Sequence, residues 1–403
     1  MVSEKFMDKK SILIFGVGEL QRSIIRRANA MGLFTVGIDP CEDASSRDEC
    51  CAFEVVGGQD YEGTLAIAKK YDVSAIVTAA TDKPLVMMSR IAEEMGLKFF
   101  SVETAIWSTD KFKMKQRFLE GGISCARGKI IKSVDEVLDL DFPLILKPRD
   151  NSGSRGVILC RDLKELSTAI SETFQYTHMD SVLVEEYIEG CEYSIESLHY
   201  DGKSHVVQFT EKHTTPFPYN VELEHIQPAD LSEELKKEIF SIVEKIGKTF
   251  KFENCPSHTE LKINGRGIYV IETSPRLGGD YITSDLTPLS TGINIEDQLL
   301  NIAVGNPVDI TSIRNEKASA VHFFSFPEGV ITHIDPQIDD VNEWDGIVSF
   351  DFKLKQYEKI NKISSSLNRY GQFVVCGDNR ETVENYIEKY SKAICNFINI
   401  KQE

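Results

Sequence analysis

Long apolar segments are missing from the sequence. No run approaches the roughly 18 apolar residues that a membrane-spanning helix needs, and the opening MVSEKFMDKK has no hydrophobic region of a signal peptide. Disulfide and zinc signatures are missing as well, because the nine cysteines form an odd number without a CxxC pair. Such cysteines fit a reducing compartment, so we expect a cytoplasmic protein that is not bound to a membrane.

Positive charge is scarce. The chain has 45 Lys and Arg residues against 63 Asp and Glu residues, a net charge of −18. This balance argues against nonspecific binding to nucleic acid, which depends on neutralising phosphates, although it permits a local basic cleft for a nucleotide. With 41% apolar and 27% charged residues in 403 positions, we expect a packed protein of two to three domains that acts on small molecules.

Strand and helix patterns alternate over the first hundred residues. SILIFGVG, FTVGID and SAIVTAA have the pattern of strands, and helices are expected near 19–31, 64–71 and 83–95. This alternation predicts a parallel, doubly wound α/β sheet. The pattern then changes to an α+β region with helices near 110–119, 162–174 and 231–250, followed by short strands after about residue 311 and a helix from about 381. Its expected strands are FPLILKPR, GVILC, SVLVEEYI, EYSIESLHY and SHVVQFT.

Two acids mark a predicted hairpin at residues 258–274. The runs HTELKI and IYVIETS each carry one acid, Glu260 and Glu272, on either side of a glycine-rich turn. A loop of three or five residues would place the acids opposite each other, with Lys262, Ser274 and Arg276 on the same face. Facing acids repel unless a positive charge lies between them, and Mg²⁺ is the ion that prefers carboxylate and phosphate oxygens.

A lysine and a small-residue loop suggest an anion site. Lys147 ends the apolar run FPLILKP, where a lysine either extends to solvent or meets an anion. The loop at residues 150–157 follows at once, and its backbone amides could enclose phosphates. An ordinary hairpin turn is the alternative for the loop.

Another segment, at residues 182–192, has the pattern of a strand that ends in a hinge. Backbone groups near Glu185, Glu186 and Ile188 could bind an adenine edge, and Glu192 could hold ribose hydroxyls. Taken alone, these residues could equally be charges at the edge of a sheet.

The first strand ends in Gly16-Val17-Gly18, where a nucleotide-binding fold places its phosphate turn. The third glycine of that fingerprint is replaced by Gln21, so we expect a plain α/β turn rather than an NAD site. Gly18 and Glu19 still lie where open parallel sheets bind ligands, which makes them candidates for substrate contact.

In order and spacing these motifs resemble the ATP-grasp superfamily. The resemblance implies a Rossmann-like pre-ATP-grasp domain at 1–107, an ATP-grasp domain at 108–310 with its ATP lobe at about 108–190, and a C-terminal extension at 311–403. It implies ATP and Mg²⁺ as cofactors, with Mn²⁺ as a substitute. The implied ATP contacts are Lys111, Lys147, Ser152, Gly153, Ser154, Gly156, Glu185, Glu186, Ile188 and Glu192; the metal ligands are Glu260, Glu272 and Ser274.

The resemblance also implies residues for chemistry and substrate. Arg276 would stabilise an acyl-phosphate and Lys212 would contact phosphate, while His225, which we expect in a loop, would lie near the substrate. The substrate positions are Gly18, Glu19, Gly278 and Gly279. The family commonly has asparagine where this chain has Ser274, and a serine oxygen can ligate Mg²⁺ or hold its water.

Several functions fit this pattern. The segments ETSPRLGGDYI and EHIQPADLS are most similar to those of L-amino acid ligases, which implies an amide bond formed from a carboxylate and an amine through an acyl-phosphate. A purine-pathway enzyme such as phosphoribosylglycinamide synthetase is the first alternative. An NAD-dependent oxidoreductase and an ATP-binding module without turnover are the others. Related enzymes are often dimers, so a homodimer is the assembly to test.

Overall fold

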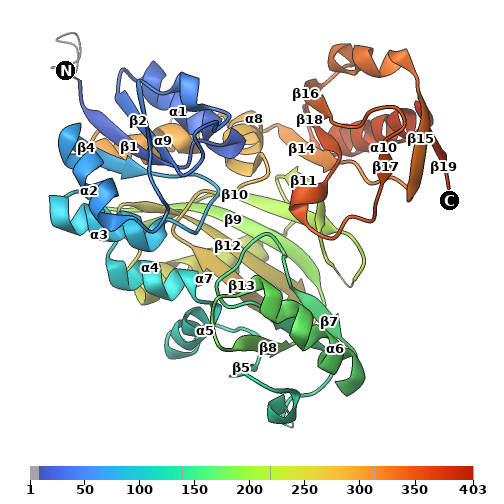
Figure 1. Ribbon diagram of the computed structural model, residues 1–403, viewed down its shortest axis with the longest axis horizontal. Coiled ribbons are helices and arrows are strands. Elements are labelled where there is room, and N and C mark those ends of the chain that lie inside the picture. The colour runs from blue at the N-terminus through green and yellow to red at the C-terminus, as the bar shows by residue number, and fades with distance from the viewer. Residues whose placement is uncertain (1–8, 138, 218, 312–314, 403) are drawn as a thin grey trace.

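The computed structural model describes residues 9–137, 139–217, 219–311 and 315–402. Figure 1 shows the N-terminal region in blue, a cyan-to-green lobe that carries β5 and β8, and a red C-terminal region at the opposite side of the molecule from that lobe. A central sheet in yellow and green lies between them. The regions are joined by packing, because hydrophobic cores of the N-terminal sheet include residues of α7 and α9.

The N-terminal sheet is parallel and has the order β3-β2-β1-β4. Its strands are β1 (Ser11–Phe15), β2 (Phe34–Asp39), β3 (Ala52–Val55) and β4 (Val73–Val77), with helices α1 (Arg22–Ala30), α2 (Tyr61–Lys70) and α3 (Leu85–Met95). Leu13 and Phe15 enter one core while Ile12 and Ile14 enter the other, which explains why β1 is apolar throughout. The predicted parallel α/β sheet is confirmed, except that α1 begins after a 3-10 turn at Glu19–Gln21.

A smaller antiparallel sheet with the order β5-β8-β6-β7 follows. It is preceded by two helices, and the amphipathic helix α6 covers it through Leu166, Ala169 and Ile170. The helix predicted near 162–174 is therefore confirmed. The elements are α4 (Val102–Thr109), α5 (Lys111–Glu120), β5 (Gly128–Ile131), β6 (Leu144–Lys147), β7 (Ile158–Cys160), α6 (Leu163–Thr173) and β8 (Val182–Glu186).

The central sheet has eight strands in the order β13-β12-β9-β10-β11-β14-β18-β16. Helix α7 (Glu233–Phe250) packs on it through Ile239 and Val243, as its apolar spacing predicts. The first strands are β9 (Cys191–Tyr200), β10 (Lys203–Thr214), β11 (Glu222–Gln227), β12 (Cys255–Asn264) and β13 (Gly267–Ser274). The expected loop around His225 is wrong: the segment is β11, because β10 and the distant β14 supply backbone partners on both sides.

The C-terminal region continues the central sheet across the expected boundary at 310/311. Strands β14, β18 and β16 join it through the β11–β14 pairing, and a second sheet has the order β17-β15-β19. The helix expected from about residue 381 begins at Arg380. The elements are α8 (Thr287–Thr291), α9 (Ile295–Val304), β14 (Ala318–Phe323), β15 (Gly329–Ile334), β16 (Ile347–Phe352), β17 (Lys359–Ile360), β18 (Gly371–Gly377), α10 (Arg380–Asn396) and β19 (Ile398–Lys401).

Among the helices that the structure describes, none has both the length and the apolar character needed to cross a membrane.

Helix α9 holds a buried acid against the N-terminal region. The Glu296 side chain is only 1% exposed, accepts a hydrogen bond from Ser23 (2.5 Å) and pairs with Arg27 of α1 (3.1 Å). Burial raises the pKa of Glu296 to about 7, and nearby Asp285 also raises it, while Ser23 and Arg27 oppose the shift. The folded protein therefore binds this proton more tightly than the unfolded chain does.

Stability should consequently fall as the pH rises from about 4.5 to 7, because the unfolded chain gives up the proton first. Glu296→Gln removes this dependence. The unfolding free energy of the variant minus that of the wild type should increase by roughly 2 to 3 kcal/mol between pH 5 and pH 8. One unit of pKa shift corresponds to about 1.4 kcal/mol of unfolding free energy. Denaturant unfolding measures it, with Glu172→Gln, an exposed acid on α6, as the control. A pH-independent difference would contradict the raised pKa.

Candidate active site

A polar cavity of about 160 Å³ lies between the β5-β8-β6-β7 sheet and the β12–β13 hairpin. Its walls bring together residues that are far apart in the sequence. Those among them that the sequence analysis selected are Lys111, Lys147, Ser152, Gly153, Ser154, Glu185, Glu186, Ile188, Glu192, Glu260, Glu272, Ser274 and Arg276.

The two hairpin acids face each other by way of a β-bulge. Asn264 pairs with Gly267, so the connecting loop has two residues rather than the three or five expected. In that register Glu260 would pair with Ile271. A bulge next to Glu260 shifts the pairing by one residue and places Glu272 opposite Glu260. Ile271 and Glu272 both line the cavity as a result.

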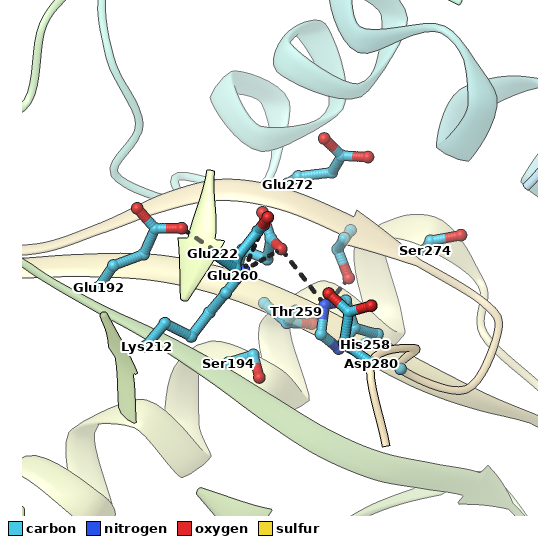
Figure 2. Close-up of polar contacts among 12 residues, drawn as sticks. Glu192, Ser194, Lys212, Glu222, His258, Thr259, Glu260, Glu272, Ser274 and Asp280 are labelled. Carbon is cyan, nitrogen blue, oxygen red and sulfur yellow. Dashed lines mark hydrogen bonds and ion pairs between the residues drawn. The ribbon is translucent and has the colours of Figure 1, made fainter. Parts of the chain in front are cut away.

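A buried lysine that lies outside the cavity lining neutralises Glu260. The Nζ atom of Lys212 lies 2.6 Å from Oε1 of Glu260, 3.4 Å from Glu222 and 3.5 Å from Glu192. Figure 2 shows these three carboxylates gathered around the lysine. Burial lowers the pKa of Lys212, but the three acids outweigh it and hold this pKa well above its ordinary value. Lys212 thus stays charged among the acids instead of lining the cavity itself.

The opposing acid has its own lysine. Lys111, the first residue of α5, places Nζ 2.6 Å from Oε2 of Glu272. Burial alone would raise the pKa of Glu260, yet Lys212 and His258 hold it well below the ordinary range. Lys212 and His258 both contact Oε1 of Glu260, and Lys111 contacts Oε2 of Glu272. Each acid therefore has one oxygen engaged by cations of the protein.

A histidine and a second buried acid complete this network. His258 lies two residues before Glu260 on the same face of β12, with Nδ1 2.6 Å from Glu196 and Nε2 3.3 Å from Glu260. Burial alone would lower its pKa, but the two acids raise the pKa of His258 to about 9. The amide of Gly278 donates to Glu196 (3.2 Å). Sequence reasoning missed this pair, although the period of two along the strand was an available signal for His258.

The N-terminal region also supplies an acid that was not predicted. Asp82, between β4 and α3, accepts a hydrogen bond from the Ser274 hydroxyl (2.6 Å) and pairs with Arg276 (2.9 Å). Burial alone would raise the pKa of Asp82, but Arg276 and Ser274 hold it below its ordinary value. Ser274 and Arg276 are thus fixed by a residue almost 200 positions earlier in the chain.

The smaller sheet supplies a second pair of cations. Glu185 on β8 is buried between Lys147 of β6 and Lys115 of α5, with 2.6 Å to Lys115. Burial alone would raise the pKa of Glu185, but both lysines lower it. Glu186 pairs with Arg127 (3.0 Å) while it lines the cavity. Because the Glu185 carboxylate is committed to lysines, Glu185 itself offers a ligand its backbone groups.

The loop before β7 needs glycine for two different reasons. Gly153 has φ +68° and the neighbouring Ser154 has φ +56°, so the chain turns through left-handed conformations above the cavity. At Gly156, φ is +73° and a Cβ atom would lie 2.7 Å from the Tyr176 ring. Gly156 therefore packs against Tyr176, whereas residues 152–154 line the cavity.

Other predicted residues lie away from the cavity walls. His225 is 1% exposed in β11, with Nε2 3.8 Å from Asp280. Glu19 is exposed and pairs with Arg22. A Cβ atom at Gly278 would lie 2.8 Å from Nδ1 of His258, so this glycine allows the chain to pass the His258–Glu196 pair. Gly279 packs on the turn after β4, where its own Cβ would meet Ala80 at 3.3 Å.

The first glycine turn cannot serve a pyrophosphate. The side chain of Gln21 accepts a hydrogen bond from Gly18 N (3.2 Å) and donates to Ala79 O (2.6 Å). Val17 N donates to the Asp39 carboxylate (2.9 Å). Two amides of this turn, those of Val17 and Gly18, are therefore already paired within the protein, which argues against an NAD-dependent oxidoreductase.

Comparisons with known proteins agree with this geometry. Residues 140–285 match the family model of the ATP-grasp domain. The chain is 23% identical over 370 residues to the alanine–anticapsin ligase of Bacillus amyloliquefaciens, covering 80% of this chain and 78% of that protein. Its structure resembles the L-amino acid ligase of Bacillus licheniformis (TM-score 0.84, 20% identity, 98% and 99% of the chains). It also resembles phosphoribosylglycinamide synthetase of Anaerococcus prevotii (TM-score 0.74, 21% identity, 98% and 100%).

Residues 140–285 therefore match an ATP-grasp domain, and the predicted ATP-grasp fold is confirmed. Ligases are among the proteins that the chain resembles in sequence and in structure.

The donor set is suited to a magnesium ion that is shared with phosphates. In the described ranges no three His, Cys, Asp or Glu side chains are grouped so as to enclose a metal by themselves. Glu260 and Glu272 instead face each other across one strand pair and both line the cavity. One or two carboxylates plus substrate phosphates and water is the usual environment of Mg²⁺ in nucleotide sites. The Ser274 hydroxyl donates to Asp82 and retains lone pairs on its oxygen.

Removing Lys212 should leave three acids without their central cation. We expect Lys212→Met to lower the thermal unfolding midpoint strongly, because an uncompensated buried charge costs about 3–5 kcal/mol. Added Mg²⁺ or Mn²⁺ should raise the midpoint of this variant more than that of the wild type, since a divalent cation relieves the repulsion. Differential scanning fluorimetry with and without metal measures both effects.

Lys262→Met provides the matched control, because the Lys262 ammonium is near only Glu192 among these acids, at 3.7 Å. Equal destabilisation of the two variants, or no extra response of Lys212→Met to metal, would contradict the role of Lys212 as the central cation.

Proposed function

We propose that this protein is an ATP- and Mg²⁺-dependent ligase that joins a carboxylate to an amine and releases ADP and phosphate. The observation that carries the proposal is the facing pair Glu260 and Glu272 in a cavity that also holds Lys111, Lys147 and the glycine loop. The ATP-grasp domain match and the similarity to two ligases that act on amino acids support it.

ATP would lie along the cavity from the smaller sheet to the hairpin. Backbone groups of 185–188 would bind the adenine edge, because the Glu185 carboxylate is held by lysines. Glu192, which also lines the cavity, would hold the ribose hydroxyls. The loop at 152–156 would cover the phosphates, and Lys111 and Lys147 would exchange part of their contact with acids for contact with phosphate oxygens.

The metal would bind where the acids face each other. Glu260 and Glu272 would each offer the oxygen that no lysine holds, with Ser274 beside them. Mg²⁺ held there would neutralise the negative charge that develops on the phosphate oxygens during phosphoryl transfer. The chain itself fixes the carboxylates before ATP arrives, and this preorganisation is the main contribution a protein makes to phosphoryl transfer.

The reaction would proceed in two steps. A carboxylate oxygen attacks the γ-phosphorus and the bond to the β-phosphate oxygen breaks, which gives an acyl-phosphate and ADP. The amine nitrogen then attacks the acyl carbon, the carbon–oxygen bond to phosphate breaks, and the nitrogen loses a proton. Arg276, held in place by Asp82, would neutralise the acyl-phosphate during both steps.

A purine intermediate is the second candidate substrate, favoured by the similarity to phosphoribosylglycinamide synthetase. It requires a phosphate site near Gly18, whose amide is paired with Gln21 instead. We therefore place amino acids first and purine intermediates second. A phosphate-release assay across amino-acid pairs and phosphoribosylamine with glycine separates the two.

Glu272→Gln should abolish amine-dependent ADP release, by at least about 100-fold, because it removes a charge that holds the metal at the transferred phosphate. The variant should remain folded, since Lys111 can still hydrogen-bond the amide oxygen, but its melting temperature should fall because a buried ion pair loses one partner. A coupled ADP assay and a thermal melt measure the two quantities. Glu234→Gln, an exposed acid on α7, is the control.

Retained turnover in Glu272→Gln would overturn the metal assignment. ATP binding by the wild type without ADP release for any acid and amine would instead favour an ATP-binding module that has lost turnover.

A further inference from the structure

A second cavity, of about 460 Å³, opens in the N-terminal region at the carboxyl ends of β1 to β4. We call it the N-terminal cavity. Its size falls in the range of small-molecule sites, which are mostly apolar, and open parallel sheets bind their ligands at this edge. Its apolar walls are formed by Phe15, Leu20, Ile38, Pro40, Val56 and Met87.

The polar groups at the base of this cavity are already satisfied. Gly18 N is bonded to Gln21, and Val17 N to Asp39, whose other oxygen accepts from Cys41 N (2.9 Å). A phosphate that bound these amides would have to break their bonds to Gln21 and Asp39. An apolar group would lose nothing by contacting the walls, and would remove from water the Leu20 side chain, which is 47% exposed.

The N-terminal cavity adjoins the candidate active site by way of a charged cleft. Gln59 and Lys83 line both the N-terminal cavity and this cleft, which has a volume of about 450 Å³ and lies between α3, the α4–α5 junction and the glycine loop. The charged cleft in turn shares Lys111, Ser152 and Glu272 with the cavity of the candidate active site. A molecule that passes between Gln59 and Lys83 would have one end in the N-terminal cavity and the other near Glu272.

Three of the four acids in the cleft are paired with a cation, and the fourth, Asp150, accepts hydrogen bonds from neutral groups. Asp82 pairs with Arg276, Glu272 with Lys111, and Asp110 with Arg149 (2.5 Å). Asp150 accepts from the Thr177 hydroxyl (2.5 Å) and from the amide of His178 (3.1 Å).

Two lysines of the same cleft, Lys83 and Lys113, form no ion pair within the described part of the chain. Lys83 is exposed at the rim that joins the cleft to the N-terminal cavity. The combination favours an anion beside an apolar group.

We propose that the carboxylate substrate carries a bulky apolar tail, which occupies the N-terminal cavity while its carboxylate passes Lys83 into the charged cleft toward Glu272. The inference rests on the proposed ligase function and adds the substrate class, an aryl-substituted or branched apolar acid. The turn at 79–84 separates this tail from Arg276, because Ala80 and Lys83 line the N-terminal cavity while Asp82 holds Arg276.

Binding without ATP tests the assignment directly. The probes are 3-phenylpropanoate, propanoate and 3-phenylpropanamide, measured by isothermal titration calorimetry on the full chain. We expect 3-phenylpropanoate to bind at least about tenfold more tightly than propanoate, because its ring is buried, and more tightly than the amide, because Lys83 attracts its charge. Equal affinity for 3-phenylpropanoate and propanoate would overturn the proposal.

Two variants assign the contacts to residues. Leu20→Trp fills the cavity and should remove the advantage of 3-phenylpropanoate over propanoate, while Lys83→Gln should remove its advantage over the amide. Leu163→Trp and Lys164→Gln are the matched controls: Leu163 is 48% exposed on α6, and Lys164 is exposed beside it. If the Leu20→Trp variant binds the three probes with the same affinities as the Leu163→Trp variant, the proposal is also overturned.

Turnover separates this inference from the function on which it rests. With one fixed amine, Leu20→Trp should raise KM for 3-phenylpropanoate about tenfold and leave KM for propanoate unchanged. Wild-type turnover with an unchanged preference in Leu20→Trp would overturn the substrate class and leave the ligase function intact. The expected binding pattern without ADP release for any acid–amine pair would overturn the ligase function and support the cavity as a site for apolar acids.

Discussion

The repulsion between Glu260 and Glu272 is the constraint on which the site depends. A β-bulge turns these acids toward each other, and the fold must then provide cations around them. Lys212 comes from β10 and Lys111 from the start of α5, while His258 lies on β12 itself. Because these cations belong to separate elements, the acid pair can exist only when α5 and the central sheet are assembled.

The charged side chains of the site are paired with one another, and this determines how the site can work. The lysines expected at phosphates are held by acids, Lys111 by Glu272 and Lys147 by Glu185. A nucleotide with its metal would therefore exchange partners within a fixed set of charges instead of filling a purely positive cleft. Such a set is costly to assemble, since each buried charge needs its partner, but it needs little rearrangement when charge moves between phosphates.

Asp82 connects the N-terminal region to this set. It orients Ser274 and Arg276 from a turn whose other residues line the N-terminal cavity. The region expected from its pattern to be a nucleotide-like fold thus has its phosphate turn closed by Gln21 and contributes a carboxylate to the neighbouring site instead. The cavity at the same sheet edge has apolar walls in place of free amide donors.

The sequence alone determined those features that depend on local patterns. The parallel N-terminal sheet, α6, α7 and the hairpin acids follow from periodicity, turn residues and the alternation of side chains along strands. Only the tertiary structure decided the placement of β11, the bulge that sets the register, and the contacts of Asp82, Glu196 and Lys115. These depend on partners far away in the chain, and no local period encodes which distant carboxylate will meet a given cation.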